Sequence, residues 1–215
     1  MNLPDCKTYL MPQRSEAWLA IRKGIFTASN FGPWLLNTGK VADAARERSI
    51  CALIAERAGC ESAPVFENWA MKRGSELEPQ AIASFEGETG LRVEPVGFCR
   101  SLHGRFGCSP DGILTGKSCG IEGKIPVPET HIRYRRAGVL PDEYIYQVHG
   151  SMAVTGADSW WFQSWNPGLA PLRILVHRDE FTEKLKSALI EFSEQFEAAW
   201  AEECKANGKE AKGEA

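Results

Sequence analysis

The most constraining feature of this sequence is a pair of short apolar segments with charged residues inside them, Cys108–Leu114 and Gly120–Pro126, separated by a glycine-containing turn. This pattern predicts two paired strands. Alternation along the second segment puts Glu122 and Lys124 on one face and the apolar residues on the other. Asp111 lies within the first segment and can reach the same face, because paired strands lie only about 4.8 Å apart.

Two converging carboxylates and an ammonium favour one kind of chemistry. Carboxylates are hard oxygen ligands suited to Mg²⁺, which completes its coordination with water and substrate phosphate. Cleavage of a phosphodiester needs an activated water and compensation of growing negative charge, and Mg²⁺ supplies both. Lys124 would orient or deprotonate the water. The residues also allow a simpler interpretation, in which Glu122 and Lys124 form a solvated pair on an edge strand and Pro110-Asp111-Gly112 is only a turn.

Hydrophobic periodicity and turn residues predict a mixture of helices and strands. Helices are expected at 15–22, 44–58, 77–88, 141–154 and 181–203, with a short helix or turn at 27–31. Strands are expected at 92–100, 104–115, 119–125, 159–165 and 172–176, after an irregular opening. Pro79 would lie in the first turn of its helix. We therefore expect an α/β (α+β) core, a central mixed sheet flanked by helices, in one domain over 1–204, and a disordered charged tail at 205–215.

Composition limits the classes of function. The formal net charge is −3, which is unusual for a nucleic-acid binder, although His131–Arg136 is locally basic. Seven cysteines without a C-x-x-C pair and four scattered histidines predict neither a disulfide framework nor a zinc site, so oxygen should hold any metal. Residues 1–30 lack the pattern of a secretory leader, and no apolar stretch reaches the roughly 20 residues of a membrane span. We expect a soluble cytoplasmic protein.

Five segments of the chain follow one another in the order seen in one known family. They are Trp18–Ser29, Gly74–Glu78, Cys108–Gly112, Glu122–Pro126 and Tyr146–Met152. The chain thus resembles the phage lambda exonuclease-like family of viral recombination (alkaline) exonucleases, within the PD-(D/E)xK nucleases. The resemblance implies a restriction-endonuclease-like core and a Mg²⁺-dependent 5′-to-3′ exonuclease. Such an enzyme digests one strand of linear double-stranded DNA from 5′-phosphorylated ends to mononucleotides and leaves a 3′ single-strand overhang for phage recombination by annealing.

The resemblance also implies roles for the residues around the strand pair. Asp111 and Glu122 would bind Mg²⁺, the backbone carbonyl of Gly123 would add a ligand, and Lys124 would serve the attacking water. Glu78 matches a further acidic position of the active site. The bland interpretation of Glu78 is a helix N-terminal charge stabilised by the dipole. Gly123 departs from the family pattern, where this position is usually bulkier and apolar.

Five more residues match family positions. Gln147 would support the site from a helix, and Met71 would wedge the duplex end apart. Arg22, Ser29 and Ser109 would bind the terminal 5′ phosphate, since a guanidinium and hydroxyls donate well to an anion. Each has an ordinary alternative: an exposed helix amide, a core methionine, a surface cation, and hydroxyls that cap a helix or stabilise a turn.

Cofactors and partners follow from the same resemblance. We expect two Mg²⁺ per active site, replaceable by Mn²⁺, a ring-shaped homotrimer around DNA and a phage single-strand annealing protein as partner, in the cytoplasm of a bacterial host. We assign no DNA-contacting residues within the expected loops around 35–43 and 128–140, and no role to Lys40. The strand Trp160–Trp165 would bury its aromatics in the core, with a subunit contact as the alternative.

Two other functions share the strand-pair residues. A site-specific endonuclease or junction resolvase of the same fold would use Asp111, Glu122 and Lys124 but would need no pocket for a 5′ phosphate. An inactive DNA-binding scaffold for recombination would keep the fold without the chemistry. A nuclease class with an iron–sulfur cluster held by four cysteines is disfavoured, because the cysteines here are scattered.

Overall fold

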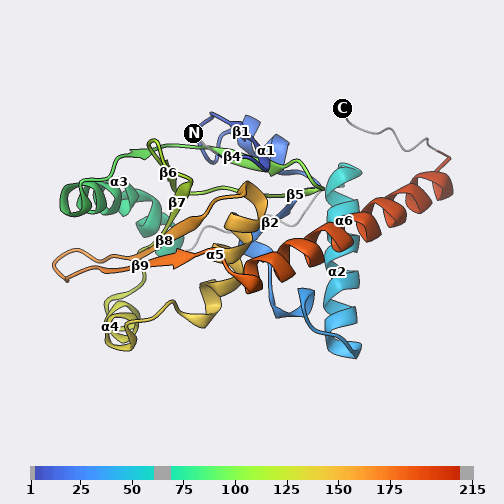
Figure 1. The fold of residues 1–215 in the computed structure, drawn as a ribbon. Coiled ribbons are helices and arrows are strands. Elements are labelled where there is room, and N and C mark those ends of the chain that lie inside the picture. The colour runs from blue at the N-terminus through green and yellow to red at the C-terminus, as the bar shows by residue number, and fades with distance from the viewer. Residues whose placement is uncertain (1–2, 61–68, 209–215) are drawn as a thin grey trace.

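The computed structural model describes residues 3–60 and 69–208, apart from the side chains of residues 70 and 71, as two sheets flanked by helices (Figure 1). The first sheet has the order β1 (Cys6–Tyr9), β4 (Phe98–Ser101), β5 (Phe106–Cys108), β2 (Phe26–Thr27). The second has the order β3 (Val93–Glu94), β6 (Gly112–Leu114), β7 (Cys119–Lys124), β8 (Ser159–Ser164), β9 (Leu172–His177). Both sheets contain parallel and antiparallel pairs. The expected mixed α/β core is confirmed, with two sheets in place of one.

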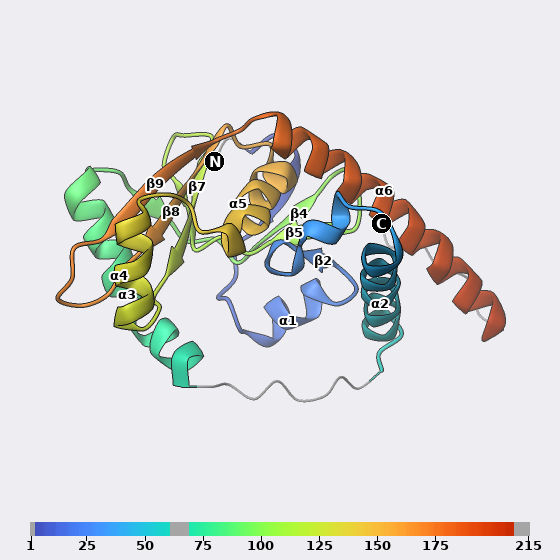
Figure 2. The same cartoon turned by 90° about the horizontal axis from the view of Figure 1, so that it is seen from below.

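Helices cover these sheets on several sides (Figure 2). They are α1 (Glu16–Arg22), α2 (Lys40–Arg57), α3 (Trp69–Thr89), α4 (Pro128–Ala137), α5 (Asp142–Thr155) and α6 (Glu180–Ala206), with 3-10 turns η1 (Ala28–Asn30) and η2 (Pro33–Leu35). Local sequence sets several of their ends. Ser15 caps α1 by accepting from the Trp18 N–H, and Asp179 begins α6 with a capping box. Glycines with positive φ, Gly138 and Gly156, end α4 and α5.

The main hydrophobic core lies around α5, which packs against both sheets and against α6. Val148 and Met152 of α5 are fully buried there, as are Trp160 and Phe162 of β8. The expectation that the aromatic strand contributes to the core is confirmed. A second, smaller cluster around Phe85 fills the space between α3 and the second sheet. These two clusters fix α3 and α5 relative to the strand pair β6–β7.

The strand pair predicted from the sequence is present. Strands β6 and β7 are antiparallel, with Gly112 opposite Ile121, and the Asp111 N–H donates to the Ile121 carbonyl at 3.2 Å. On its other side β7 pairs in parallel with β8, which places Glu122 opposite Phe162. Strand β7 therefore lies inside the sheet. The alternative of a solvated Glu122–Lys124 pair on an edge strand is wrong.

Two expected strands are each divided between the sheets. The segment expected at 92–100 forms β3 and β4, and the segment expected at 104–115 forms β5 and β6. Pro95 and Pro110 lie at the divisions, where the missing proline N–H interrupts a ladder. The opening of the chain, expected to be irregular, contains β1, which pairs with β4 along Cys6–Tyr9.

Helix boundaries also depart from expectation. Helix α3 begins at Trp69, so Pro79 lies inside it and not in its first turn. The expected loop around 128–140 contains α4. The buried residues of this helix are His131 and Tyr134, so its buried face showed no periodic pattern of aliphatic residues in the sequence. Helix α6 reaches Ala206, which makes 205–206 helical, and the rest of the expected tail from 209 lies outside the described residues. Within the described ranges, no helix has the length and apolar character of a membrane-crossing segment.

Two helical glycines allow a matched test of the packing around α5. A Cβ at Gly150 would lie 2.4 Å from Cδ2 of buried Phe31, whereas a Cβ at Gly87 in α3 meets nothing within 4 Å. We expect Gly150→Ala to lower the free energy of unfolding by about 1–3 kcal/mol through overpacking. Gly87→Ala should raise it by about 0.5–1 kcal/mol, because alanine favours helix. Urea unfolding measures both, and equal midpoints for Gly150→Ala and the wild type would contradict the packing.

Candidate active site

Three carboxylates from three elements line one cavity of about 440 Å³. Glu78 comes from α3, Asp111 from the residue before β6, and Glu122 from β7. Lys124 lines the same cavity, as alternation along β7 predicts. The structure thus brings together the four charged residues proposed from the sequence.

Glu122 is the most buried member of the group, with 4% of its surface exposed. Its Oε1 accepts hydrogen bonds from Lys124 Nζ at 2.6 Å and from Gln147 Nε2 at 2.7 Å. Gln147 reaches Glu122 from α5, so the core packing of α5 positions this amide. The interpretation of Gln147 as an exposed helix amide is wrong.

Asp111 and Glu78 are carboxylates that lie close to one another and to the negative charge of Glu122. Burial and then the charge of Glu122 raise the pKa of Asp111 well above its ordinary value. Burial also raises the pKa of Glu78, Glu122 adds to that rise, and Arg14 opposes it. Asp111 Oδ2 accepts the backbone N–H of Gly123 at 2.6 Å, which fixes the carboxylate against β7 between Glu122 and Lys124. A bound cation would relieve this crowding of charge.

Lys124 carries the compensating positive charge. Burial disfavours its ammonium, but Glu122 and Asp111 outweigh burial and raise the pKa of Lys124. Its Nζ also lies 5.1 Å from the centroid of the Tyr144 ring, within the range of a cation–π contact. Without a bound cation, Lys124 is therefore protonated and acts as a donor.

The donors in this cavity fit Mg²⁺. In the part of the chain that the structure describes, no group of three or more His, Cys, Asp or Glu forms a ready-made metal site. Mg²⁺ does not require one, because it takes one or two protein carboxylates and completes its shell with water and substrate phosphate. Asp111 and Glu122 each engage one oxygen in the contacts above and have a second to offer.

A second cluster lies two residues before Asp111. Ser109 Oγ accepts from Arg22 at 2.7 Å and from Trp18 Nε1 at 3.0 Å, and the Arg22 guanidinium stacks over the Trp18 ring at 4.1 Å. Arg22 and Trp18 are four residues apart on α1 and so share a face. The structure brings Arg22 and Ser109 together, as expected of a common anion site, and Arg22 is half-buried rather than a free surface cation.

Among the described residues, Ser29 has no side-chain hydrogen bond to the Arg22–Ser109 cluster or to the carboxylates, and Met71 is described by its backbone alone. Strands β2 and β5 are parallel, so η1 with Ser29 and the turn with Ser109 leave the sheet at the same edge. The exposed Ser29 hydroxyl lies 3.4 Å from Thr27 Oγ1, and Thr27, not Ser29, occupies the N-cap position. Met71 belongs to α3, but its side chain lies outside the described residues.

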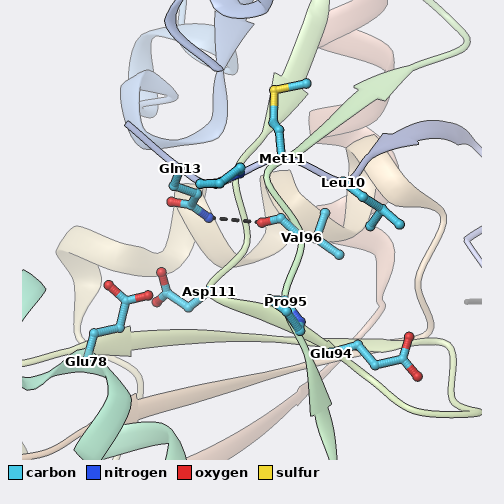
Figure 3. A pocket seen from close by; sticks show the side chains of 9 residues that line it. Leu10, Met11, Gln13, Glu78, Glu94, Pro95, Val96 and Asp111 are labelled. Carbon is cyan, nitrogen blue, oxygen red and sulfur yellow. Dashed lines mark hydrogen bonds between the residues drawn. The ribbon is translucent and has the colours of Figure 1, made fainter. Parts of the chain in front are cut away.

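A neighbouring cavity of about 640 Å³ reaches two of these carboxylates, Glu78 and Asp111, from another side. Figure 3 shows Glu78 and Asp111 turned toward one another at its border, with Met11, Val96 and the amide of Gln13 above them. Sequence reasoning missed the residues of the 10–14 segment and Tyr144, because no motif includes them. Their contribution depends on tertiary contacts.

The repulsion among the carboxylates predicts that Asp111 lowers the stability of the cation-free protein while it allows Mg²⁺ to bind. In the absence of divalent cations, we expect Asp111→Asn to raise the free energy of unfolding by about 0.5–2 kcal/mol, because repulsion is removed while the amide oxygen can still accept from Gly123. Mg²⁺ should then stabilise the wild type and not the variant. Urea unfolding in chelator and in Mg²⁺ tests this, with exposed Asp158→Asn as the control. A variant less stable than the wild type in chelator would contradict the prediction.

Comparison with known proteins agrees with this geometry. Residues 17–158 match the YqaJ-like viral recombinase domain. The curated proteins contain no match to the chain. Among solved structures, an alkaline exonuclease (LHK-Exo) from Laribacter hongkongensis matches with a TM-score of 0.77 and 31% identity, over 90% of this chain and 98% of that one. Its complex with dAMP matches with the same TM-score and coverage at 30% identity.

A more distant structure shares the fold alone. The phage related exonuclease from Haemophilus somnus 129PT matches with a TM-score of 0.59 and 13% identity, over 85% of this chain and 96% of that one. The family match spans more than half of the chain and agrees with the resemblance seen in its motifs. The chain belongs to the YqaJ-like viral recombinase family, a lambda exonuclease-like family with the PD-(D/E)xK nuclease fold.

Proposed function

We propose that this protein is a Mg²⁺-dependent 5′-to-3′ exonuclease that digests one strand of linear double-stranded DNA from 5′-phosphorylated ends to mononucleotides. The observation that carries the proposal is the spacing of the two clusters. Ser109, bonded to Arg22, and Asp111, beside Glu122, are separated by Pro110 alone. Two residues span at most about 7 Å. That is the scale of one or two nucleotide steps, each rising about 3.4 Å along a strand.

The residues of the cavity divide the chemistry among themselves. Asp111 and Glu122, with the carbonyl of Gly123, would hold Mg²⁺, which activates water and neutralises charge on the phosphoryl oxygens. We propose two ions per site, replaceable by Mn²⁺. Lys124 donates from its ammonium to the attacking water or to the phosphate, and the bond from Lys124 keeps Glu122 aligned.

Outer residues complete the catalytic arrangement. The amide of Gln147 holds the same oxygen of Glu122 that Lys124 contacts, which leaves the other oxygen available to a cation. Glu78 faces Asp111 from α3 and is the further acidic member of the site. Its raised pKa lets it hold or release a proton near the phosphate oxygens.

The Arg22 cluster would recognise the end of the strand. A guanidinium and a hydroxyl form charge-assisted hydrogen bonds to a terminal 5′ phosphate, and Ser29 would add a second hydroxyl at the same sheet edge. We keep Met71 as the proposed wedge at the duplex end. A site-specific endonuclease has no use for a pocket of this kind, so the cluster favours an exonuclease over a resolvase.

Assembly and partners extend the proposal. The exposed arginines of α4, Arg133, Arg135 and Arg136, follow Lys124 by nine to twelve residues and offer phosphate contacts on a chain whose net charge is −3. We propose that three copies form a ring around DNA and that a phage single-strand annealing protein takes up the 3′ overhang for recombination. Both proposals rest on the family resemblance.

Activity on DNA of different topology is the first test. With Mg²⁺, linear 5′-phosphorylated duplex should release mononucleotides, while closed-circular duplex stays intact. Lys124→Ala should slow release by about 100-fold or more, since a donor to the reacting phosphate is lost, and should still bind DNA. Lys117→Ala, an exposed lysine of the β6–β7 turn, is the control. Discrete internal fragments would instead identify an endonuclease, and no cleavage at all would indicate a scaffold.

The Arg22 cluster predicts a preference for phosphorylated ends. We expect Arg22→Ala to slow digestion of 5′-phosphorylated duplex by about 10- to 100-fold, the worth of one or two charge-assisted hydrogen bonds. Digestion of 5′-hydroxyl duplex should change little, so the preference disappears. Arg48→Ala, on the exposed face of α2, should preserve it. If Arg22→Ala digests both ends with the wild-type ratio, the cluster does not read the terminal phosphate.

A further inference from the structure

Two short segments carry the chain from one sheet to the other. Residues 95–97 connect β3 to β4, and residues 109–111 connect β5 to β6. We call them the crossing segments. The second one contains both Ser109 of the Arg22 cluster and Asp111 of the carboxylate group. The backbone carbonyls in the crossing segments lie between strands, so they need donors from elsewhere.

Two side chains from the N-terminal segment supply these donors, and each bridges both crossing segments. Gln13 Nε2 donates to the Val96 carbonyl at 3.1 Å and to the Pro110 carbonyl at 2.8 Å. Trp18 Nε1 donates to the Gly97 carbonyl at 2.9 Å and to Ser109 Oγ at 3.0 Å. Figure 3 shows the bond from Gln13 to Val96 directly above Asp111. The crossing segments are therefore held together at two successive points.

Of the two bridges, that of Gln13 acts between the clusters. The Pro110 carbonyl that it binds belongs to the residue between Ser109 and Asp111. A primary amide carries two N–H groups, which match the two carbonyls. The backbone supports this placement, because the next residue, Arg14, has a positive φ of 68° and its side chain bonds Ser75 of α3. A non-glycine residue keeps such a conformation only where its surroundings determine it.

We propose that Gln13 is a positioning residue that fixes the distance and orientation between the end-recognising Ser109 and the metal-binding Asp111. It acts through the Pro110 carbonyl and the crossing segments. The inference rests on the proposed function, since it assumes that Asp111 holds a cation. Without the Gln13 bridge, the Pro110 turn can shift, and Asp111 loses its alignment with Glu122 while Arg22 and Trp18 still hold Ser109.

The test replaces Gln13 by a side chain of similar length without donors. Gln13→Met and the smaller Gln13→Ala are compared with Gln195→Met, which removes an amide that bonds Glu191 on α6. Two quantities are measured at a temperature where circular dichroism shows every variant folded. One is the Kd for Mn²⁺ by calorimetry on DNA-free protein, and the other is kcat and KM on 5′-phosphorylated duplex.

For both Gln13 variants we expect the Mn²⁺ Kd to rise and kcat to fall, each by about 10- to 100-fold, as for other partners that orient a metal ligand. KM should change by less than about threefold, because Ser109 and Arg22 keep their contacts and substrate binding is largely retained. Gln195→Met should match the wild type. A Gln13 variant that melts earlier but keeps the wild-type Kd and kcat would show a purely structural role and overturn the proposal.

Asp111→Asn separates this inference from the proposed function. If Asp111→Asn abolishes Mn²⁺ binding while both Gln13 variants bind as the wild type does, only the positioning role fails. If the wild type binds no Mn²⁺, or Asp111→Asn binds it equally well, the metal site itself is misassigned, and the inference falls with it.

Discussion

The contact between Lys124 and Glu122 holds together a group of charges that would otherwise repel one another. Burial raises the pKa of both Asp111 and Glu78, and the charge of Glu122, itself almost fully buried, adds to both rises. The Lys124 ammonium, itself kept protonated by Glu122 and Asp111, compensates part of that charge. Removing one partner of a buried pair leaves the other uncompensated, which is costly. Helix α3, strand β7, helix α5 and the segment that joins the two sheets each contribute a residue that contacts or lines this group.

Local sequence predicted the elements that carry most of this group. Alternation in the segment that became β7 placed Glu122 and Lys124 on one face, and the short turn made β6 its antiparallel partner. Periodicity placed α5 to within one residue at each end, whereas α6 runs three residues past its expected end at 203. The division of strands at Pro95 and Pro110 could not be predicted as a change of sheet, because a proline marks an interruption without saying where the chain goes next.

The site was predictable as far as its motifs extended. Arg22 and Ser109, far apart in sequence, do meet, and the family pattern had grouped them. The pattern did not include Gln13 or Tyr144, because Gln13 contacts two backbone carbonyls and the Tyr144 ring contacts the Lys124 ammonium. Contacts of this kind produce no recognisable motif spacing or hydrophobic periodicity in the sequence. The hydrogen-bond acceptors of the Gln13 amide can be identified only once the fold shows where the chain crosses between the sheets.

In the proposed function, the carboxylates beside Lys124 hold a catalytic cation next to a site for a DNA end. Anomalous diffraction at the manganese edge, from crystals grown with Mn²⁺ and a 5′-phosphorylated duplex, tests it directly. We expect a manganese peak bounded by Asp111, Glu122 and the carbonyl of Gly123, with the terminal phosphate on Arg22. Manganese bound elsewhere, with this cavity empty and the DNA end away from Arg22, would contradict it.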